Sequence, residues 1–446
     1  MKFPFVPSKL GLVGLALCLG ATTACINSNE EEVSSDVASA DNAPSAEDDY
    51  NNLVFDLHFP KNGKVPETLG AITVHNAIRY LLAGTKEGPS KDKLLTLLQK
   101  NGSNQSITNY EESYRKLLEM KSGPLKVANR IYANKNKFTV LETADQYLKE
   151  LTTEADVNQY VRDATKDTIK DLIPENTFDN RTQMVVVSAA HFLAKWKKSY
   201  CLKPGKDKND ENTFFEGGKD ITECEINTKV YEDGDKKGII LDFARGEGED
   251  QYQLVVIVPG CDKAKQGCDE KERVKNVFDS LIYDTQGTND EGDPAFAGYY
   301  DITYLAVPNL DLSFNGDIQA ALRDSSNQDV LQGLEFDNFF DEPAPASLQF
   351  FHKSTFKMNH QGASAIGATA VGASVRSLPQ ETEFVVDGPA HYFLIRQVQD
   401  DQTRPNSNII VFTARSDIKI EKIEGNSTVD NGVDGDGLIG PFDGLD

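Results

Sequence analysis

Residues 362–379 read GASAIGATAVGASVRSLP, a run of small or apolar residues that ends at a single cation. The fourteen residues before Arg376 carry no charge, although 26% of the chain is charged. The run is too short for a membrane helix, which needs about 20 apolar residues. Gly367 and Gly372 disfavour any other helix, since each costs about 1 kcal/mol relative to alanine. A flexible linker fits the composition, but linkers seldom carry isoleucine and valine. A strand is therefore favoured.

Both faces of such a strand would be small and uncharged. Alternate residues of a strand point to opposite faces, so Ala363, Ala365, Gly367 and Thr369 would share one face. A segment of this kind fits between two strands of an existing sheet at little steric cost. Left exposed it invites aggregation, so we expect that the chain keeps it for a use.

The end of the run resembles a protease substrate. Pro379 favours an extended conformation at Leu378, the shape in which proteases accept substrates. The bond between Arg376 and Ser377 is one that a trypsin-like enzyme cleaves, because an aspartate in its specificity pocket pairs with arginine. Taken alone, an Arg-Ser pair also fits an ordinary solvated surface loop.

Composition limits the classes of function. The chain has 446 residues, 39% of them hydrophobic, which predicts a folded core. Its formal net charge of −24 argues against nucleic acid or an anionic membrane as the main partner. Neither the histidines nor the cysteines show metal-ligand spacing, and the acidic tail lacks the spacing of a calcium loop. We predict no metal and no cofactor, and no nucleophile-elbow pattern of an enzyme is present.

The N-terminus has the pattern of an export signal. Residues 1–25 combine two lysines, an apolar run and small residues that end at Cys25. The small residues before Cys25 resemble the cleavage box of a bacterial lipoprotein, in which the cysteine is lipidated. Thr22 stands where that box usually has leucine, so a lipoprotein and a freely secreted protein both stay open. Residues 26–49 predict an acidic tether, and the only expected membrane contact is a lipid anchor.

Four cysteines remain in the body of the chain, and an oxidising compartment predicts that they pair. Three pairings are open. We favour Cys201 with Cys224 and Cys261 with Cys268, because the second pair closes a short loop flanked by glycine.

Hydrophobic periodicity predicts helices in the first half of the chain and strands in the second. Helices are expected over 140–152 and 164–174, and residues 182–196, TQMVVVSAAHFLAKW, predict a buried central strand. Strands dominate beyond residue 200. Helices followed by strands without regular alternation indicate an α+β fold.

Several stretches together resemble the serpin family. They include NNLVFDLHF, LKVANRIYANK, FHKSTFKMNHQGASAIGATA, FVVDGPAHYFLIR and NIIVFTAR, in the order of the family and over about residues 50–418. The resemblance implies one α+β domain with three β-sheets, eight or nine helices and an exposed reactive loop. We assign the domain to 50–420, its loop to about 360–383, and a Gly/Asp-rich tail to 421–446.

The resemblance also implies a mechanism. Serpin reactive loops begin at a hinge glycine, and the scissile bond usually follows the fourteenth residue after it. Counting from Gly362 reaches Arg376, with Ser377 beyond the bond. The protein would then be a suicide-type inhibitor and not an enzyme, acylated at Arg376 before its loop inserts into the central sheet. The implied hinge residues are Gly362, Ala363, Ser364, Ala365, Gly367, Ala368 and Thr369.

Further positions match structural residues of the family. His352 would lie under the opening strands with Ser188 and Thr73 in a polar cluster, and Trp196 at the top of the sheet where insertion starts. The implied partner is a trypsin-like serine protease, with an arginine-specific cysteine protease as the alternative, and the protein is expected to be a monomer. The competing hypothesis is a non-inhibitory serpin that serves as a binding module with a passive loop. The small hinge residues argue against it.

Overall fold

A computed structural model describes most of the chain. The described residues are 46–60, 66–98, 123–145, 147–206, 213–246, 249–261, 268–283, 287–288, 294–295, 297–326, 330–341, 348–363, 380–398, 407–423 and 426–430. All of them belong to one compact unit, Pro44–Asp446. The expected signal with Cys25, hinge residues 364–369 and the Arg376–Ser377 bond lie outside the described residues.

Helices are concentrated in the first half of the unit, as the periodicity predicts. The described α-helices are α1 (Ala46–His58), α2 (Ala71–Ala83), α3 (Pro89–Leu98), α5 (Glu154–Ala164), α6 (Lys219–Thr222), α7 (Glu270–Tyr283) and α8 (Gln319–Ser326). Two 3₁₀ turns, η2 (Glu142–Ala144) and η3 (Ser199–Cys201), accompany them. Within the described ranges, none of the helices is both long and apolar enough to cross a membrane.

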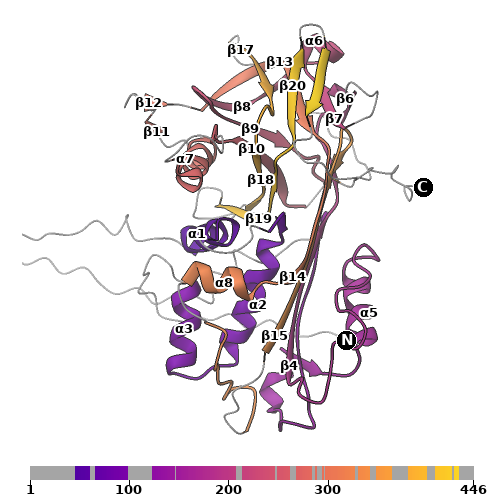
Figure 1. Cartoon of the computed structure of the whole chain (residues 1–446), viewed down its shortest axis with the longest axis vertical. Coiled ribbons are helices and arrows are strands. Elements are labelled where there is room, and N and C mark those ends of the chain that lie inside the picture. The colour runs from indigo at the N-terminus through magenta and orange to yellow at the C-terminus, as the bar shows by residue number, and fades with distance from the viewer. Residues whose placement is uncertain are drawn as a thin grey trace, which may run out of the picture. The chain divides into compact units, whose positions relative to one another are not determined.

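Sheet A is the long five-stranded sheet. Its order is β14 (Leu310–Asp317), β15 (Leu348–Met358), β4 (Met184–Phe192), β2 (Leu125–Ala133) and β3 (Leu148–Glu150). Helices cover both faces, with α2 packed on one and α5 on the other (Figure 1). Every residue of β4 is buried for this reason, which confirms the predicted central strand.

Two further sheets share one long strand. Sheet B has the order β1 (Thr68–Leu69), β19 (Ser407–Ser416), β18 (Ala390–Val398), β10 (Gln251–Val258), β9 (Lys236–Asp242) and β8 (Ile226–Asp233). Sheet C contains β17 (Gln380–Val385), β13 (Gly298–Pro308), β7 (Phe214–Gly217) and β6 (Leu202–Gly205). Strand β13 joins them, because residues 298–302 pair with β8 and residues 305–308 pair with β7. The α+β fold with three sheets is confirmed.

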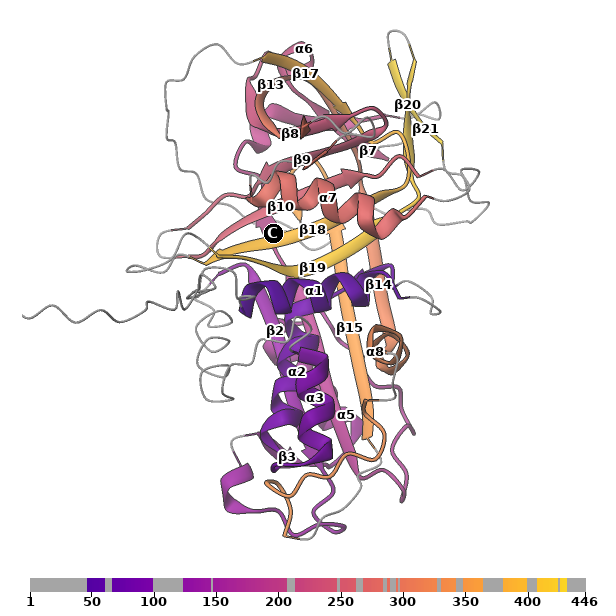
Figure 2. The same cartoon turned by 90° about the vertical axis from the view of Figure 1, so that its left-hand side faces the viewer.

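Three short strand pairs complete the described structure. They are β5 (Ala194–Lys195) with β16 (Gly362–Ala363), β11 (Gly287–Thr288) with β12 (Pro294–Ala295), and β20 (Lys419–Ile423) with β21 (Asn426–Asp430). The last pair follows sheet B and lies near β13 and β17 (Figure 2). Strand β21 falls in the segment that the sequence analysis assigned to the tail.

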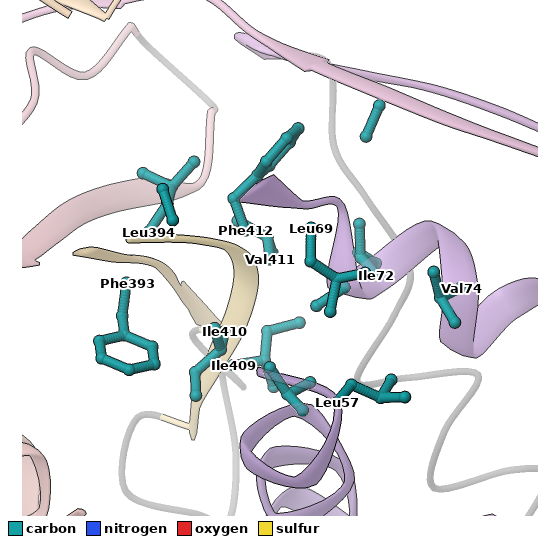
Figure 3. Packing of buried hydrophobic residues seen from close by; sticks show 14 of the residues in the cluster. Leu57, Leu69, Ile72, Val74, Phe393, Leu394, Ile409, Ile410, Val411 and Phe412 are labelled. Atoms are coloured by element: carbon teal, nitrogen blue, oxygen red, sulfur yellow. The ribbon is translucent and has the colours of Figure 1, made fainter. Parts of the chain in front are cut away.

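The main core forms where α1 and α2 pack on sheet B. Leu57 and Ile72 from the helices meet Phe393, Ile410 and Phe412 from the two central strands (Figure 3). All five side chains are almost fully buried, and burying one such side chain stabilises the fold by about 1.5–3 kcal/mol. This core ties the N-terminal helices to strands more than 300 residues away.

Two expected helices are wrong. Within 140–152 the chain instead makes η2 and then β3, which pairs in parallel with the end of β2. Within 164–174 the chain leaves α5 through Lys166 and Asp167, which have positive φ. The side-chain oxygen of Asn158 accepts the backbone N–H groups of Leu172 and Ile173, and it holds this segment as a loop. Helical spacing arose here because apolar side chains fasten a loop to the sheet.

Both favoured disulfides are present. Cys201 is bonded to Cys224 with their Cα atoms 5.3 Å apart, and Cys261 to Cys268 with theirs 5.9 Å apart. The first bond ties the chain after β5 to the loop before β8, next to β6 and β7 of sheet C.

Candidate functional site

The centre of sheet A is a seam between two parallel strands. We call the direct pair of β4 and β15, from Met184 opposite Leu348 to His191 opposite Thr355, the β4–β15 seam. Parallel pairs are slightly less stable per residue than antiparallel ones. A strand that entered the seam in the opposite direction would replace one parallel pair with two antiparallel pairs.

At one end of the seam the chain has already turned back. Asn359 and Gly362 exchange two backbone hydrogen bonds, of 2.9 and 3.2 Å, so His360 and Gln361 form a two-residue turn. The next residues, Gly362 and Ala363, pair antiparallel with Lys195 and Ala194 of β5. We call residues 359–363 the hinge hairpin. Its last two residues lie back against the end of β15.

Glycine is required at position 362 of the hinge hairpin. Its φ is +151°, which side chains rarely adopt, and a Cβ atom there would overlap the carbonyl oxygen of Ala194. Ala363 beside it is 1% exposed. The conformation and the burial both explain why the segment begins with two of the smallest residues.

Trp196 donates two hydrogen bonds to the hinge hairpin. Its indole Nε1–H donates to the Asn359 carbonyl at 2.7 Å, and its backbone N–H donates to the Gln361 carbonyl at 3.2 Å. The indole stacks on Phe243 with ring centres 4.4 Å apart and planes 14° apart. The side chain of Asn359 accepts the backbone N–H of Gln361 at 2.8 Å, which fixes the turn from within.

A closed polar ring fastens the middle of the seam. The backbone N–H of Gly70 donates to His352 Nε2 at 3.2 Å, and His352 Nδ1 meets Ser188 Oγ at 3.0 Å. Ser188 donates to Thr73 Oγ1 at 2.8 Å, and Thr73 donates to the Gly70 carbonyl at 2.8 Å. The hydrogen bonds agree in direction only if the imidazole is neutral with its proton on Nδ1. The polar ring therefore joins β4, β15 and the start of α2.

Burial keeps the polar ring neutral. All three side chains are fully buried, and this burial lowers the pKa of His352 to about 3. Protonation would place a second donor against the Gly70 N–H and leave an uncompensated charge between the two strands. The polar ring thus adds a few hydrogen bonds between uncharged groups to the backbone pairing of β4 and β15, and it contains no ion pair.

The structure brings together three of the four predicted sheet residues. Thr73, Ser188 and His352 share the polar ring, whereas Trp196 lies at the hinge end of the seam. Sequence analysis missed Asn359 and Gln361, although an asparagine three residues before a hinge glycine is typical of a tight turn. In the described part of the chain, no three His, Cys, Asp or Glu side chains gather in a way that could hold a metal ion.

Comparison with known proteins identifies the family. Residues 69–404 match the family described as Serpin (serine protease inhibitor). Serpin B10 of Rattus norvegicus is 24% identical over 338 residues, which cover 70% of this chain and 79% of the relative. Alignments with several other curated serpins span about three fifths of those proteins. The chain belongs to the serpin family, whose members generally act on proteases without being enzymes.

Solved structures establish the same fold. Arabidopsis AtSerpin1 in its native stressed conformation has a TM-score of 0.62 at 16% identity, and the match covers 83% of this chain and 98% of that one. Thyroxine-binding globulin in complex with thyroxine has a TM-score of 0.59 at 15% identity, with coverage of 83% and 98%. At such identities the likeness concerns the fold.

Proposed function

We propose that this serpin inhibits a trypsin-like serine protease by inserting its cleaved loop into sheet A. The observation that carries the proposal is the hinge hairpin at the open end of the β4–β15 seam. The chain is turned back at Gly362, its next residue is already buried, and the residues that follow in the sequence are small and uncharged.

The register of the hinge hairpin supports this mechanism. Continued past Ala363 opposite Met358, the register would set residue 365 beside Phe356, 367 beside Ser354 and 369 beside His352. These residues of β15 point to the buried side of the sheet. Alanine, glycine and threonine at 365, 367 and 369 are small enough to face it. The Thr369 hydroxyl would also enter beside the polar ring, where a polar partner is available.

The chemistry starts with the protease. Its serine attacks the Arg376 carbonyl carbon, the bond to the Ser377 nitrogen breaks, and Arg376 remains as an ester on the enzyme. Insertion then forms about ten backbone hydrogen bonds, each worth about 0.5–1.5 kcal/mol net. The total of about 5–15 kcal/mol is comparable with the stability of a whole domain. Inhibition requires that insertion outrun hydrolysis of the ester.

Two alternatives have specific support. An arginine-specific cysteine protease would accept the same Arg376–Ser377 bond, so it is the second candidate target. A carrier role has the precedent of thyroxine-binding globulin on this fold. Such a protein would be cut at the loop without trapping the protease.

Trypsin tests these alternatives directly. The purified protein is incubated with trypsin and analysed on denaturing gels, and the released C-terminal fragment is sequenced. We expect an adduct that resists SDS and a new N-terminus at Ser377. Cleavage at Ser377 without any adduct contradicts the inhibitor proposal and supports the carrier role. An adduct with an arginine-specific cysteine protease in place of trypsin changes only the target.

We also propose export, on the pattern of residues 1–25 together with the two disulfides. Metabolic labelling with a radioactive fatty acid separates the two forms. Label that is lost on Cys25→Ala supports a lipoprotein, whereas unlabelled protein in the medium supports free secretion.

A further inference from the structure

The chain continues past sheet B and binds the outer face of sheet C. After β19 ends at Ser416, residues 417–420 run along sheet C, and the Ile420 N–H donates to the Val386 carbonyl at 2.7 Å. The Ile420 side chain is 1% exposed. We call residues 416–420 the C-terminal clasp. Strand β20 contacts β13, and Figure 1 shows the two side by side at the same end of the domain as β17.

The C-terminal clasp covers an apolar surface that solvent would otherwise meet. Ile420 packs on Phe214 of β7 and on Tyr304 and Ala306 of β13, with Val385 of β17 and Ile418 at the edge of the cluster. This cluster is separate from the main core. The outer face of sheet C is thus built to receive these two isoleucines.

Strand β17 is the strand most affected by this contact. Among the described strands it pairs only with β13, in parallel, from Gln380 opposite Tyr300 to Val385 opposite Ala306. Near its start it is also attached by the exposed ion pair of Lys219 with Glu381 and the hydrogen bond from Thr303 Oγ1 to the Thr382 carbonyl. Exposed ion pairs contribute little. Towards its end the Phe384 side chain is buried in the main core. The clasp secures the opposite end, at Val386.

The number of residues between the inserting segment and β17 limits how far an uncut reactive loop can enter sheet A. In the register of the hinge hairpin, residue 373 would reach Leu348, ten residues along β15 from Met358, or about 33 Å. Strand β17 lies at the hinge end, because its partner β13 leads into β14, which starts opposite Met358. Residues 374–380 are seven residues and span at most about 25 Å. An uncut loop can therefore insert fully only if β17 leaves sheet C.

We propose that the C-terminal clasp is an intramolecular lock on β17 that prevents the uncut loop from entering sheet A. The inference rests on the proposed insertion mechanism and adds a contact that prevents insertion before cleavage. To free β17 the chain must break the Ile420–Val386 hydrogen bond and the contact of Val385 with the apolar cluster, in addition to the pairing with β13 and the burial of Phe384. The lock thereby preserves the state that can be cleaved.

The same lock does not oppose insertion after cleavage. Once the bond between Arg376 and Ser377 is cut, residues 362–376 are free of β17, which stays in sheet C with the fragment that starts at Ser377. The clasp belongs to this fragment too. It should therefore change the lifetime of the uncut protein and leave the rate of reaction with a protease unchanged.

Deletion of the clasp tests this separation. We compare the full chain, a variant that lacks residues 418–446 and a control that lacks only residues 431–446, which keeps the clasp. Each is held at 37 °C, and samples are tested for trypsin cleavage before Ser377. Amide exchange of residues 380–386 reads the release of β17 directly, whether or not the loop inserts.

We expect deletion of 418–446 to speed exchange over 380–386 and to shorten the half-life of the cleavable form about tenfold, the equivalent of about 1.4 kcal/mol. The control should behave as the full chain does. If this deletion prevents folding, Ile420→Ala makes the same test with a smaller change. An unchanged half-life, or exchange that is not faster, overturns the lock.

The test is independent of the proposed function in one respect. Wild-type protein cut before Ser377 must gain resistance to heat if the loop inserts. If it gains none, the insertion mechanism is wrong, whereas exchange over 380–386 still reports whether the clasp holds β17.

Discussion

The β4–β15 seam of sheet A and the β18–β19 pair of sheet B are both buried central strand pairs, yet they are built in opposite ways. The β18–β19 pair is antiparallel and buries large side chains, with Phe393 packed on Phe55 and Phe278 and Phe412 packed on Phe356. The hinge half of the seam is parallel and pairs Ser188 with His352 and Ala190 with Ser354. Large apolar side chains resist separation through lost contacts and exposed area. The hinge half of the seam gives up few such contacts, so it is the place where we expect a strand to begin to enter.

The largest expected effect is in sheet B. Phe393 is fully buried against Phe55 and Phe278, at ring distances of 5.2 and 5.3 Å. We expect Phe393→Ala to lower the free energy of unfolding by about 3–5 kcal/mol. Urea unfolding measures it, with the exposed Tyr200→Ala as a control that should change stability by less than about 0.5 kcal/mol. Equal losses in both variants would contradict the assignment of sheet B as the rigid part.

A charge in the inserting strand should separate cleavage from trapping. Continued past Ala363, the register of the hinge hairpin would turn residue 365 of an inserted strand to the buried side and residue 364 to the other side, beside the half-exposed Lys357. We expect Ala365→Glu to lower the yield of SDS-resistant trypsin complex at least about tenfold, because a buried unpaired charge is costly. Ser364→Glu is the matched control and should retain most of the yield. Full trapping by Ala365→Glu would disprove insertion in this register.

Removing one hydroxyl should loosen the seam selectively. Ser188→Ala takes one donor and one acceptor from the polar ring and leaves His352 Nδ1–H without its partner. We expect a loss of about 1–3 kcal/mol in the free energy of unfolding, and faster amide exchange over β4 and β15 than over β18 and β19. Equal acceleration in both sheets would mean that the ring acts on the whole domain.

Acid should weaken the seam by a smaller amount. The folded pKa of His352, about 3, lies below the ordinary value of 6.5, so between these values only the unfolded chain takes up the proton. Stability from this group is complete above pH 6.5 and falls as the pH falls, by about 1 kcal/mol from pH 6 to pH 5. Burial lowers the pKa of His58 and His391 too. The slope of the free energy of unfolding against pH must therefore be compared between His352→Gln and the wild type. Identical slopes would exclude His352 as a contributor.

Much of the fold was predictable because its signals are local. The run 182–196 predicted β4, and the alternating segments beyond residue 200 predicted the strands of sheets B and C. The helices expected over 140–152 and 164–174 failed for the opposite reason. Their apolar residues have helical spacing, but Leu148 pairs with Ile131 and Ile173 is held by Asn158, and such contacts leave no trace in a short window.

The residues of the candidate site likewise divide into those that the sequence predicted and those whose role only the structure showed. Thr73, Ser188 and His352 were assigned through resemblance, and their hydrogen-bonded circuit became visible only when three distant segments met. The pairing of Cys201 with Cys224 was one of three open possibilities, favoured because Cys261 and Cys268 close a short loop flanked by glycine. The alternation of Ile418, Lys419 and Ile420 is compatible with a strand, but nothing in the sequence indicated that Ile420 covers sheet C, because the residues of β7 and β13 that it contacts lie more than 100 positions earlier in the chain.

The sequence by itself determined that residues 362–375 are small or apolar and carry no charge, and that an arginine follows them. That much depends on residue size, charge and spacing. Only the tertiary structure decided that this segment starts at the end of a parallel seam, in a turn held by Trp196 and Asn359. It also decided that Ile420 packs on sheet C and hydrogen-bonds to Val386 after β17. The physical reason is that these contacts join residues far apart in the chain. Their energy depends on which surfaces meet, and the folded core decides that.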